Sequence, residues 1–361
     1  MAACEMSLKA ETEFWLGRKV LITGHTGFKG TWLTLLLEFL GAEVYGLALA
    51  PPTTPSLFAE VEARPRQGGV SIIGDILEPG RLAAAFQESR AEVAFHLAAQ
   101  ALVGQSFLDP EGTFAVNVMG TVKFLEAARR APGLKAAVVI TSDKCYRNDG
   151  RLSGYGEDDP LGGDDPYSAS KAAAELATAA WRLSFFRAGP LLVASARAGN
   201  VIGGGDFSTD RLVPDALRSF AEGRPLVLRR PGARRPWQHV LDPLSGYLAL
   251  ARCLCEGRRD LAGGWNFGPG PADHWPVGQL AGRLAELWGE GATVDQTPAP
   301  AYHEAETLTL KADRAREELG WQSRLSLAEA LAWTVEWYRS FYRGGRPLET
   351  IQRQIAAYSS L

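Results

Sequence analysis

The stretch Val20-Leu-Ile-Thr-Gly24-His-Thr-Gly27-Phe-Lys-Gly30 decides the fold, because an apolar run leads through a glycine-rich turn into a helical segment. Glycine turns also occur in plain tight packing, so the strand before this turn and the helix after it give it meaning. The spacing GxxGxxG leaves the helix N-terminus open to a pyrophosphate, which backbone N–H groups and the helix dipole would hold. The turn therefore predicts a dinucleotide site, with contacts from Gly24, His25, Gly27, Phe28, Lys29 and Gly30.

Short apolar runs alternate with helical segments over the first two hundred residues, which is typical of a parallel sheet. The predicted strands are Val20–Thr23, Val44–Leu49, Val70–Gly74, Val93–Ala98, Ala137–Thr141 and Leu191–Ala196. The predicted helices are Gly30–Leu40, Pro79–Glu88, Pro110–Arg130 and Pro166–Phe186. The last two follow Asp-Pro, an aspartate cap with a first-turn proline. We expect an α/β fold, a doubly wound parallel sheet of the Rossmann type, with a smaller C-terminal substrate-binding lobe.

The domain organisation follows from where this alternation weakens, at about residue 200. We expect a loose leader over residues 1–17 and a dinucleotide-binding domain over 18–200. Residues 201–361 would form mainly the smaller lobe, with excursions back to the sheet. The tail from Lys311 to Trp321 and the Trp- and Leu-rich stretch to Tyr342 are predicted to be helical, with Gly320 as a helix stop.

Composition narrows the classes of function. At 361 residues, 46% of them hydrophobic, the chain can bury a large core. The formal net charge of -3 gives no support for a nucleic-acid or anionic-membrane partner. No run of about 18 apolar residues is present, and Met1–Thr12 lacks the apolar region of a signal peptide. The four scattered cysteines show neither a disulfide framework nor a metal spacing, so we expect a reduced, cytoplasmic protein without a metal.

Tyr167 and Lys171 stand four residues apart in Tyr-Ser-Ala-Ser-Lys, so a phenol and an ammonium share one helix face. Free tyrosine titrates at about pH 10, and a nearby ammonium favours its phenolate. The pair therefore predicts a base with its activator, and the ammonium could also hold a ribose hydroxyl. A YxxxK match alone is common on solvated helix faces. Together with the glycine turn, this one predicts nicotinamide chemistry.

Ser142-Asp143-Lys144 directly follows a predicted central strand, at the edge where an open α/β sheet binds its ligand. A hydroxyl, a carboxylate and an amine in succession are costly to bury at a strand end. The alternative is a surface ion pair between Asp143 and Lys144. We predict that these three residues join Tyr167 and Lys171 in the catalytic set.

Further cofactor contacts are predicted at the ends of the third and fourth strands. The Asp75 carboxylate, next to Ile76, could accept a hydrogen bond from the adenine amino group or be a solvated turn residue. The fourth strand ends in residues that would let it approach a flat cofactor, or would merely pack: Ala98, Ala99 and Gln100. Leu47–Pro52 carries neither an acid for a ribose 2′-hydroxyl nor an arginine for a 2′-phosphate, so this segment does not select between NAD and NADP.

These motifs and the chain length resemble the extended short-chain dehydrogenase/reductase family, the NAD-dependent epimerases and dehydratases, and within it the nucleotide-sugar 4,6-dehydratases. The resemblance runs from about Lys19 to Trp337. Longer stretches are similar to the branch that acts on CDP-glucose: Thr23–Gly30, His96–Gln100, Thr141–Tyr146, Gly199–Asp206 and Arg235–Val240. Lys144 fits that branch, because related dTDP-glucose dehydratases have glutamate there.

The resemblance implies a lyase that converts CDP-D-glucose to CDP-4-dehydro-6-deoxy-D-glucose and water by an internal NAD redox cycle. Tyr167 would take the proton of the 4-hydroxyl, which Ser142 positions, while the C4 hydride passes to NAD. Lys144 would remove the C5 proton as Asp143 protonates the departing 6-hydroxyl. The hydride would then return to C6.

The resemblance also assigns the substrate contacts. They are Ser106, Asn200, Arg211, Arg235 and His303. The amide and the two guanidinium groups suit a diphosphate. Gly104 departs from the arginine that CDP-type relatives usually carry two positions before the serine. Arg211 could instead be a surface residue, and His303 and Glu304 could be ordinary loop residues.

Two other functions stay open. Nucleotide-sugar 4-epimerases and 4-reductases keep the tyrosine and lysine but need no acid/base pair for elimination, so Asp143-Lys144 disfavours them. A non-catalytic dinucleotide-sensing protein has no need of Tyr167 as a base. The resemblance further implies deoxysugar synthesis, such as that for a lipopolysaccharide O-antigen. It also implies a homodimer, or a tetramer, formed through the helices after Pro110 and Pro166.

Overall fold

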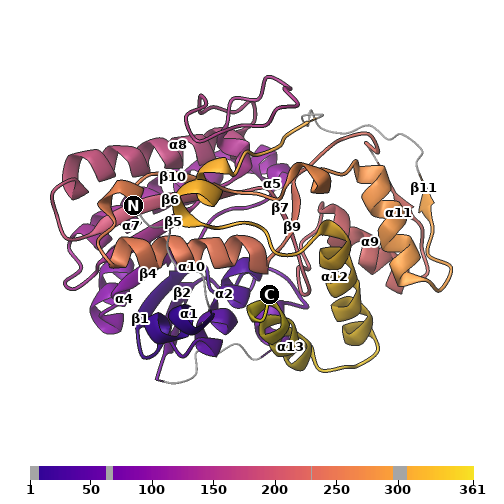
Figure 1. Cartoon of the computed structure of the whole chain (residues 1–361), viewed down its shortest axis with the longest axis horizontal. Helices are drawn as coiled ribbons and strands as arrows, with labels where there is room; N and C mark the ends of the chain where they lie inside the picture. The colour runs from indigo at the N-terminus through magenta and orange to yellow at the C-terminus, as the bar shows by residue number, and fades with distance from the viewer. Residues whose placement is uncertain (1–7, 62–67, 229, 296–306) are drawn as a thin grey trace.

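The computed structural model describes residues 8–61, 68–228, 230–295 and 307–361, and its centre is a seven-stranded sheet (Figure 1). The strands are β1 (Lys19–Thr23), β2 (Glu43–Ala48), β3 (Val70–Ile73), β4 (Val93–His96), β5 (Ala136–Ile140), β6 (Leu192–Ala198) and β10 (Gly264–Phe267). Neighbouring strands are parallel, in the order β10-β6-β5-β4-β1-β2-β3. This confirms the predicted doubly wound fold and adds β10, which the sequence pattern did not predict.

Alternate strand residues face two helical layers. Val20 and Ile22 of β1 pack into one core, whereas Leu21 packs into the other. One layer contains α2 (Phe28–Phe39) and α10 (Leu241–Cys255), and the other contains α4 (Arg81–Ser89), α7 (Gly120–Arg129) and α8 (Pro166–Trp181). Both faces of the central strands are buried, which explains why their sequences are continuously apolar.

The two predicted Asp-Pro helix starts are confirmed. Asp109 and Asp165 each accept a hydrogen bond at 2.9 Å from the backbone N–H three residues further on. These bonds begin α6 (Pro110–Phe114) and α8. The predicted helix over Pro110–Arg130 forms, but it contains a π-helical turn, η1 (Ala115–Met119), between α6 and α7. Such turns recur at functional sites.

We refer to the elements after residue 200 that lie outside the seven-stranded sheet as the smaller lobe, and its helices α9 and α11 lie at the right of Figure 1. Its elements are β7 (Asn200–Ile202) paired with β9 (Trp237–His239), β8 (Leu226–Val227) paired with β11 (Val294–Asp295), α9 (Leu212–Ala221), α11 (Val277–Trp288), α12 (Leu327–Tyr342) and α13 (Pro347–Ser359). Shorter elements are α3 (Leu57–Glu60), α5 (Val103–Leu108), η3 (Arg182–Phe186), η4 (Arg259–Leu261) and η5 (Pro271–Asp273). The chain returns from this lobe to the large sheet through α10 and β10.

The prediction of a loose leader is wrong for residues 8–17. Leu8–Trp15 forms helix α1, and Trp15 is fully buried. Glu11 joins α1 to α10 through an ion pair with Arg252 at 3.2 Å. A helix this short is marginally stable on its own, so its stability comes from packing against residues that are distant in the sequence. Its own residues therefore show no distinct helical pattern.

The stretch Lys311–Trp321 is helical only in part, as the π-helical turn η6 (Ala315–Leu319). The Lys311 N–H donates to the Tyr155 carbonyl at 2.9 Å, and this contact holds the start of the stretch against a remote segment. Gly320 ends the turn with φ 70, so the predicted stop is confirmed. The predicted helix up to Tyr342 is α12, which a reciprocal capping box between Ser326 and Glu329 begins.

Two of the four cysteines, Cys145 and Cys255, are free thiols. Across the described part of the chain, no helix is long and apolar enough to cross a membrane. The same residues contain no group of three or more His, Cys, Asp or Glu side chains that could hold a metal ion.

Candidate active site

The three glycines of the turn have different steric roles. Gly24 has φ 80, and a Cβ there would lie 2.7 Å from the Ala98 nitrogen. A Cβ on Gly30 would lie 2.1 Å from the Gly24 oxygen, whereas one on Gly27 would meet nothing closer than 3.4 Å. Gly24 and Gly30 therefore allow the tight turn and the close packing of α2, while Gly27 leaves the N-terminus of α2 open.

The side chain of His25 does not lie at the open N-terminus of α2. Its ring is buried, its Nε2 lies 2.7 Å from the Ser71 Oγ, and a Cβ on Gly46 would overlap it. Burial lowers the pKa of His25 to about 4, so the imidazole is neutral. The ring packs against β2 and β3, and only the backbone of His25 is left to contact a cofactor. Phe28, by contrast, approaches Gly203, which directly follows β7.

The end of β4 is held beside the glycine turn. Thr23 of β1 pairs with His96 of β4, and the Thr23 Oγ1 lies 2.8 Å from the His96 Nδ1. This register brings Leu97 and Ala98 next to Gly24, and Ala99 follows along the chain. The Gln100 amide donates to the Leu102 carbonyl and to the Thr113 hydroxyl, both at 3.0 Å, so its side chain orders the loop.

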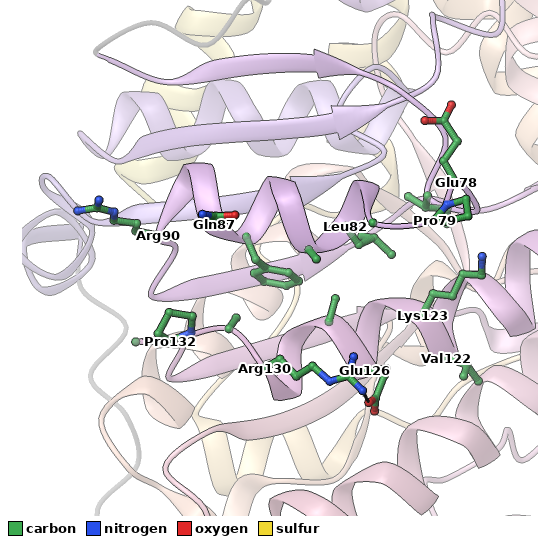
Figure 2. Close-up of a pocket in the computed structure, with 17 residues that line it drawn as sticks. Glu78, Pro79, Leu82, Gln87, Arg90, Val122, Lys123, Glu126, Arg130 and Pro132 are labelled. Carbon is green, nitrogen blue, oxygen red and sulfur yellow. Dashed lines mark ion pairs between the residues drawn. The ribbon is translucent and has the colours of Figure 1, made fainter.

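The end of β3 is arranged differently. The Asp75 Oδ1 accepts from the Leu77 N–H at 2.8 Å, so one carboxylate oxygen serves the turn. The Ile76 side chain packs with α4 and α7 and lines a cavity of about 1020 Å³ between these helices (Figure 2). The lining includes Leu82, Phe86 and Lys123 but none of the predicted catalytic residues. Any cofactor contact of Ile76 is therefore left to its backbone.

Helix α8 carries Tyr167 and Lys171 on one buried face, with Glu175 one turn further on. Burial raises the pKa of Tyr167 to about 12, although a hydrogen bond with Ser142 and the charge of Arg211 act to lower it. Burial lowers the pKa of Lys171 to about 8, against the charge of Glu175. Helical spacing sets a shared face for Tyr167 and Lys171 but not where the two long side chains end, so the expectation that Lys171 lowers the pKa of Tyr167 stays a prediction.

Ser142 links the two predicted catalytic segments. It follows β5 and caps the short turn η2 (Asp143–Cys145) by accepting from the Lys144 N–H at 3.2 Å. Its Oγ donates to the Asp143 Oδ1 at 2.9 Å, and Ser142 is close enough to the Tyr167 phenol to act on its pKa, which it lowers. One hydroxyl therefore lies between the phenol on α8 and the carboxyl after β5.

Asp143 is buried, so the alternative of a surface ion pair is wrong. Burial raises the pKa of Asp143, and the charge of Lys144, the hydrogen bond from Ser142 and the charge of Arg235 oppose that rise. The Oδ2 atom is buried without a hydrogen-bond partner among the described residues, which is costly for a polar atom. A carboxyl in these surroundings suits a general acid.

Positive side chains gather around this turn. Burial lowers the pKa of Lys29 to about 8, and the positive charges of Arg211 and Lys171 act in the same direction. Arg211 precedes α9 and pairs with Asp206 at 3.2 Å, while Arg235 is buried and acts on Asp143. The site therefore suits an anionic ligand that bears phosphates.

The other predicted substrate contacts have different surroundings. Ser106 is buried on α5, and its Oγ donates to the Val103 carbonyl at 2.7 Å. Asn200 begins β7 and pairs with Trp237, two residues after Arg235. His303 and Glu304 lie outside the described residues.

Two buried residues of this region did not stand out in the sequence. Asn117, in the π-helical turn η1, accepts from the Gln100 N–H at 2.8 Å and donates to the Ser170 Oγ at 2.9 Å. It thereby links the loop after β4 to the segment of Tyr167 and Lys171. No local pattern marks a π-helical turn. Glu175 could have been found, because it continues the four-residue spacing of Tyr167 and Lys171.

The parallel sheet, the glycine turn and the buried Ser142, Tyr167 and Lys171 define the class of dinucleotide-dependent enzymes of the short-chain dehydrogenase/reductase type. The chain belongs to the NAD dependent epimerase/dehydratase family, whose model matches residues 20–259. It is therefore an enzyme of an NAD-dependent family, and the family resemblance expected from its motifs is confirmed.

The chain is similar in sequence and structure to particular enzymes of this family. The chain is 44% identical over 357 residues to a CDP-glucose 4,6-dehydratase of Salmonella typhimurium, with 97% of this chain and 98% of the relative covered. Among solved structures, an epimerase of Methanothermobacter thermautotrophicus superposes with a TM-score of 0.82 at 25% identity, covering 96% of this chain and 97% of that one. A dTDP-glucose 4,6-dehydratase of Streptomyces venezuelae with NAD bound gives 0.75 at 26% identity, covering 91% and 99%.

Proposed function

We propose that the protein is a lyase that converts CDP-D-glucose to CDP-4-dehydro-6-deoxy-D-glucose and water by an internal NAD redox cycle. The observation that carries this proposal is the buried turn with Ser142, Asp143 and Lys144 beside Tyr167, because it adds an acid/base pair to an oxidising set. Epimerases and reductases of the same fold have no need of that pair. The relative named CDP-glucose 4,6-dehydratase supports CDP-glucose as the substrate.

NAD fits the residues at the glycine turn. The open N-terminus of α2 at Gly27 would hold the pyrophosphate, and Asp75 would hold the adenine end. Lys171 would hold a ribose hydroxyl. NAD, when bound, supplies the hydride acceptor for C4 and the hydride donor for C6. The family description favours NAD over NADP.

The protein side chains handle the protons. Tyr167 takes the proton of the 4-hydroxyl, and Ser142 hydrogen-bonds the same oxygen. The resulting 4-ketone acidifies C5, so that Lys144 can remove the C5 proton. Asp143 begins protonated, as its raised pKa favours, and gives its proton to the 6-hydroxyl, which leaves as water. When C6 regains the hydride, Lys144 returns its proton to C5, and proton exchange with solvent restores Tyr167 and Asp143.

The positively charged side chains of the site would bind the nucleotide sugar. Arg211 and Arg235, with Asn200, would bind the diphosphate, and Ser106 would contact the sugar. His303, which lies outside the described residues, would contact the nucleotide. Arg211 already lies against Asp206 and the Ala101 carbonyl, so a phosphate would compete for a guanidinium group that is held in place.

We also infer a cytoplasmic homodimer that serves deoxysugar synthesis, with a tetramer as the alternative. Large apolar side chains are exposed on and next to the adjoining helices that begin at Pro110 and Pro166. They are Phe107, Leu108, Phe114, Met119, Leu176, Leu183 and Phe185. Such a concentration of exposed apolar side chains is typical of an interface, and a second copy of the chain would cover it.

Turnover of CDP-glucose tests the proposed function. Purified protein with NAD and CDP-glucose is expected to form a 4-keto-6-deoxy sugar, seen by its ultraviolet absorbance after alkalinisation. Parallel reactions with dTDP-, GDP- and UDP-sugars are expected to give far less. Protein that binds NAD but forms no ketosugar from any of these sugars would contradict elimination and favour the epimerase, reductase or sensor.

Substitution of two glycines separates folding from cofactor binding. Gly30→Ala is expected to lower the free energy of unfolding by about 3 kcal/mol, because its Cβ would overlap the Gly24 oxygen. Gly27→Ala should fold normally but bind NAD about tenfold more weakly, because its methyl group would face the pyrophosphate. Thermal unfolding and NAD titration measure the two effects. Wild-type NAD affinity in Gly27→Ala would argue against a pyrophosphate at this turn.

A further inference from the structure

Glu175 is a buried carboxylate that none of the proposed chemical steps uses. It is 3% exposed, and three side chains donate to it. The Thr141 hydroxyl donates to its Oε1, while the Ser195 hydroxyl and the Arg197 guanidinium donate to its Oε2, both at 2.7 Å. Thr141 immediately precedes Ser142, so one of these bonds ends at the catalytic turn itself.

The network continues to the other end of the same turn. Arg197 donates to the Tyr146 hydroxyl at 2.6 Å, and that hydroxyl donates to the Asn266 Oδ1 at 2.7 Å. Thr141 and Tyr146 flank the segment that carries Ser142, Asp143 and Lys144. Both flanks are thus tied, directly or through Arg197, to one carboxylate on α8.

Glu175 also lies one helical turn after Lys171. Its negative charge raises the pKa of Lys171, against burial. The charged and titratable groups around the pair come from several elements. Lys29, His96 and Cys145 interact with Lys171, while Arg182, Arg197 and Cys145 interact with Glu175.

Stability alone is a weak reason for this arrangement. A buried ion pair such as Glu175–Arg197, at 2.7 Å, often contributes no more than apolar packing of the same volume would. Fully satisfied buried networks do, however, fix the relative geometry of the segments that they join.

We propose that Glu175 is a positioning residue that fixes the turn of Ser142, Asp143 and Lys144 relative to Tyr167 and Lys171 on α8. This inference rests on the proposed function, because it concerns the alignment of the groups that oxidise C4 with those that eliminate water. Glu175 itself does not touch the substrate. Misplacement of reacting groups by a fraction of an ångström would show in kcat rather than in binding.

Two single-hydroxyl variants form the matched test. Thr141→Val and Ser195→Ala each remove one hydrogen bond to Glu175, but only Thr141 adjoins the catalytic turn. Thr141→Val is expected to lower kcat about tenfold with KM changed less than about twofold. Ser195→Ala, with a similar change in melting temperature, should keep kcat within about twofold of the wild type.

The pH profile of Glu175→Gln gives a readout that loss of stability would not move. Lys171 acts as an ammonium, so kcat falls when rising pH removes its proton. Without the negative charge of Glu175 the ammonium loses its proton more easily, and the fall is expected to begin at lower pH. If the unpaired Arg197 prevents folding of this variant, the comparison of Thr141→Val with Ser195→Ala still tests the positioning role of Glu175.

The outcomes separate the two proposals. Absence of ketosugar formation by the wild type would refute the proposed function. Active wild type together with equal kcat values for Thr141→Val and Ser195→Ala would refute the positioning role alone. A folded Glu175→Gln with an unshifted alkaline limb would also refute it.

Discussion

Replacement of Tyr167 by phenylalanine is expected to lower kcat by about a thousandfold, because it removes the base of the first step. The ring would stay packed in the same buried position on α8, so the fold and NAD binding should persist. Only the oxygen next to Ser142 is lost. The reaction would stop before C4 is oxidised, so neither ketosugar nor reduced nicotinamide should form.

Ketosugar assays and the absorbance of reduced nicotinamide after one addition of CDP-glucose would measure this effect. Tyr45→Phe is a matched control, because it removes a phenol oxygen that bonds Glu43 on β2, away from the site. It should retain kcat within about twofold. Normal formation of reduced nicotinamide by Tyr167→Phe would show that another group is the base.

Asp143→Asn is expected to lower ketosugar formation by about a hundredfold or more, because an amide cannot protonate the leaving 6-hydroxyl. C4 oxidation uses Tyr167 and should continue, so reduced nicotinamide is expected to accumulate on the enzyme. This accumulation would distinguish the variant from Tyr167→Phe. The Ser142 hydroxyl could still donate to the remaining carbonyl oxygen at position 143.

The same variant tests the electrostatics of the turn. Because burial raises the pKa of Asp143 above its unfolded value, ionisation of this group opposes folding as the pH rises through the folded pKa. Asparagine removes that opposition, so Asp143→Asn should be as stable as the wild type at pH 7, or more so. Thermal unfolding at pH 7 and at acidic pH measures this difference. Marked destabilisation at pH 7, or loss of reduced nicotinamide, would contradict the role of Asp143 as a protonated acid.

Much of the fold could be predicted because its signals are local. Most strands of the first two hundred residues are mainly apolar and buried, although the edge strand β3 is only partly buried. Each Asp-Pro start carries its cap within four residues. The glycine turn and the Tyr167–Lys171 pair also depend on spacing within one or two turns. Helix α1, strand β10 and the extended start at Lys311 were not predicted, because remote segments stabilise them.

The candidate site divides in the same way. The sequence by itself determined the phosphate-binding turn, the catalytic residue types and the helix face that carries Tyr167 and Lys171, since neighbours along the chain specify these features. Only the tertiary structure decided that His25 turns into the sheet, that Asp143 is buried with an unpartnered oxygen, and that Glu175 meets both Thr141 and Arg197. These contacts join residues that lie about twenty or more positions apart on different elements, and the relative placement of those elements comes from packing and burial, which no local pattern encodes.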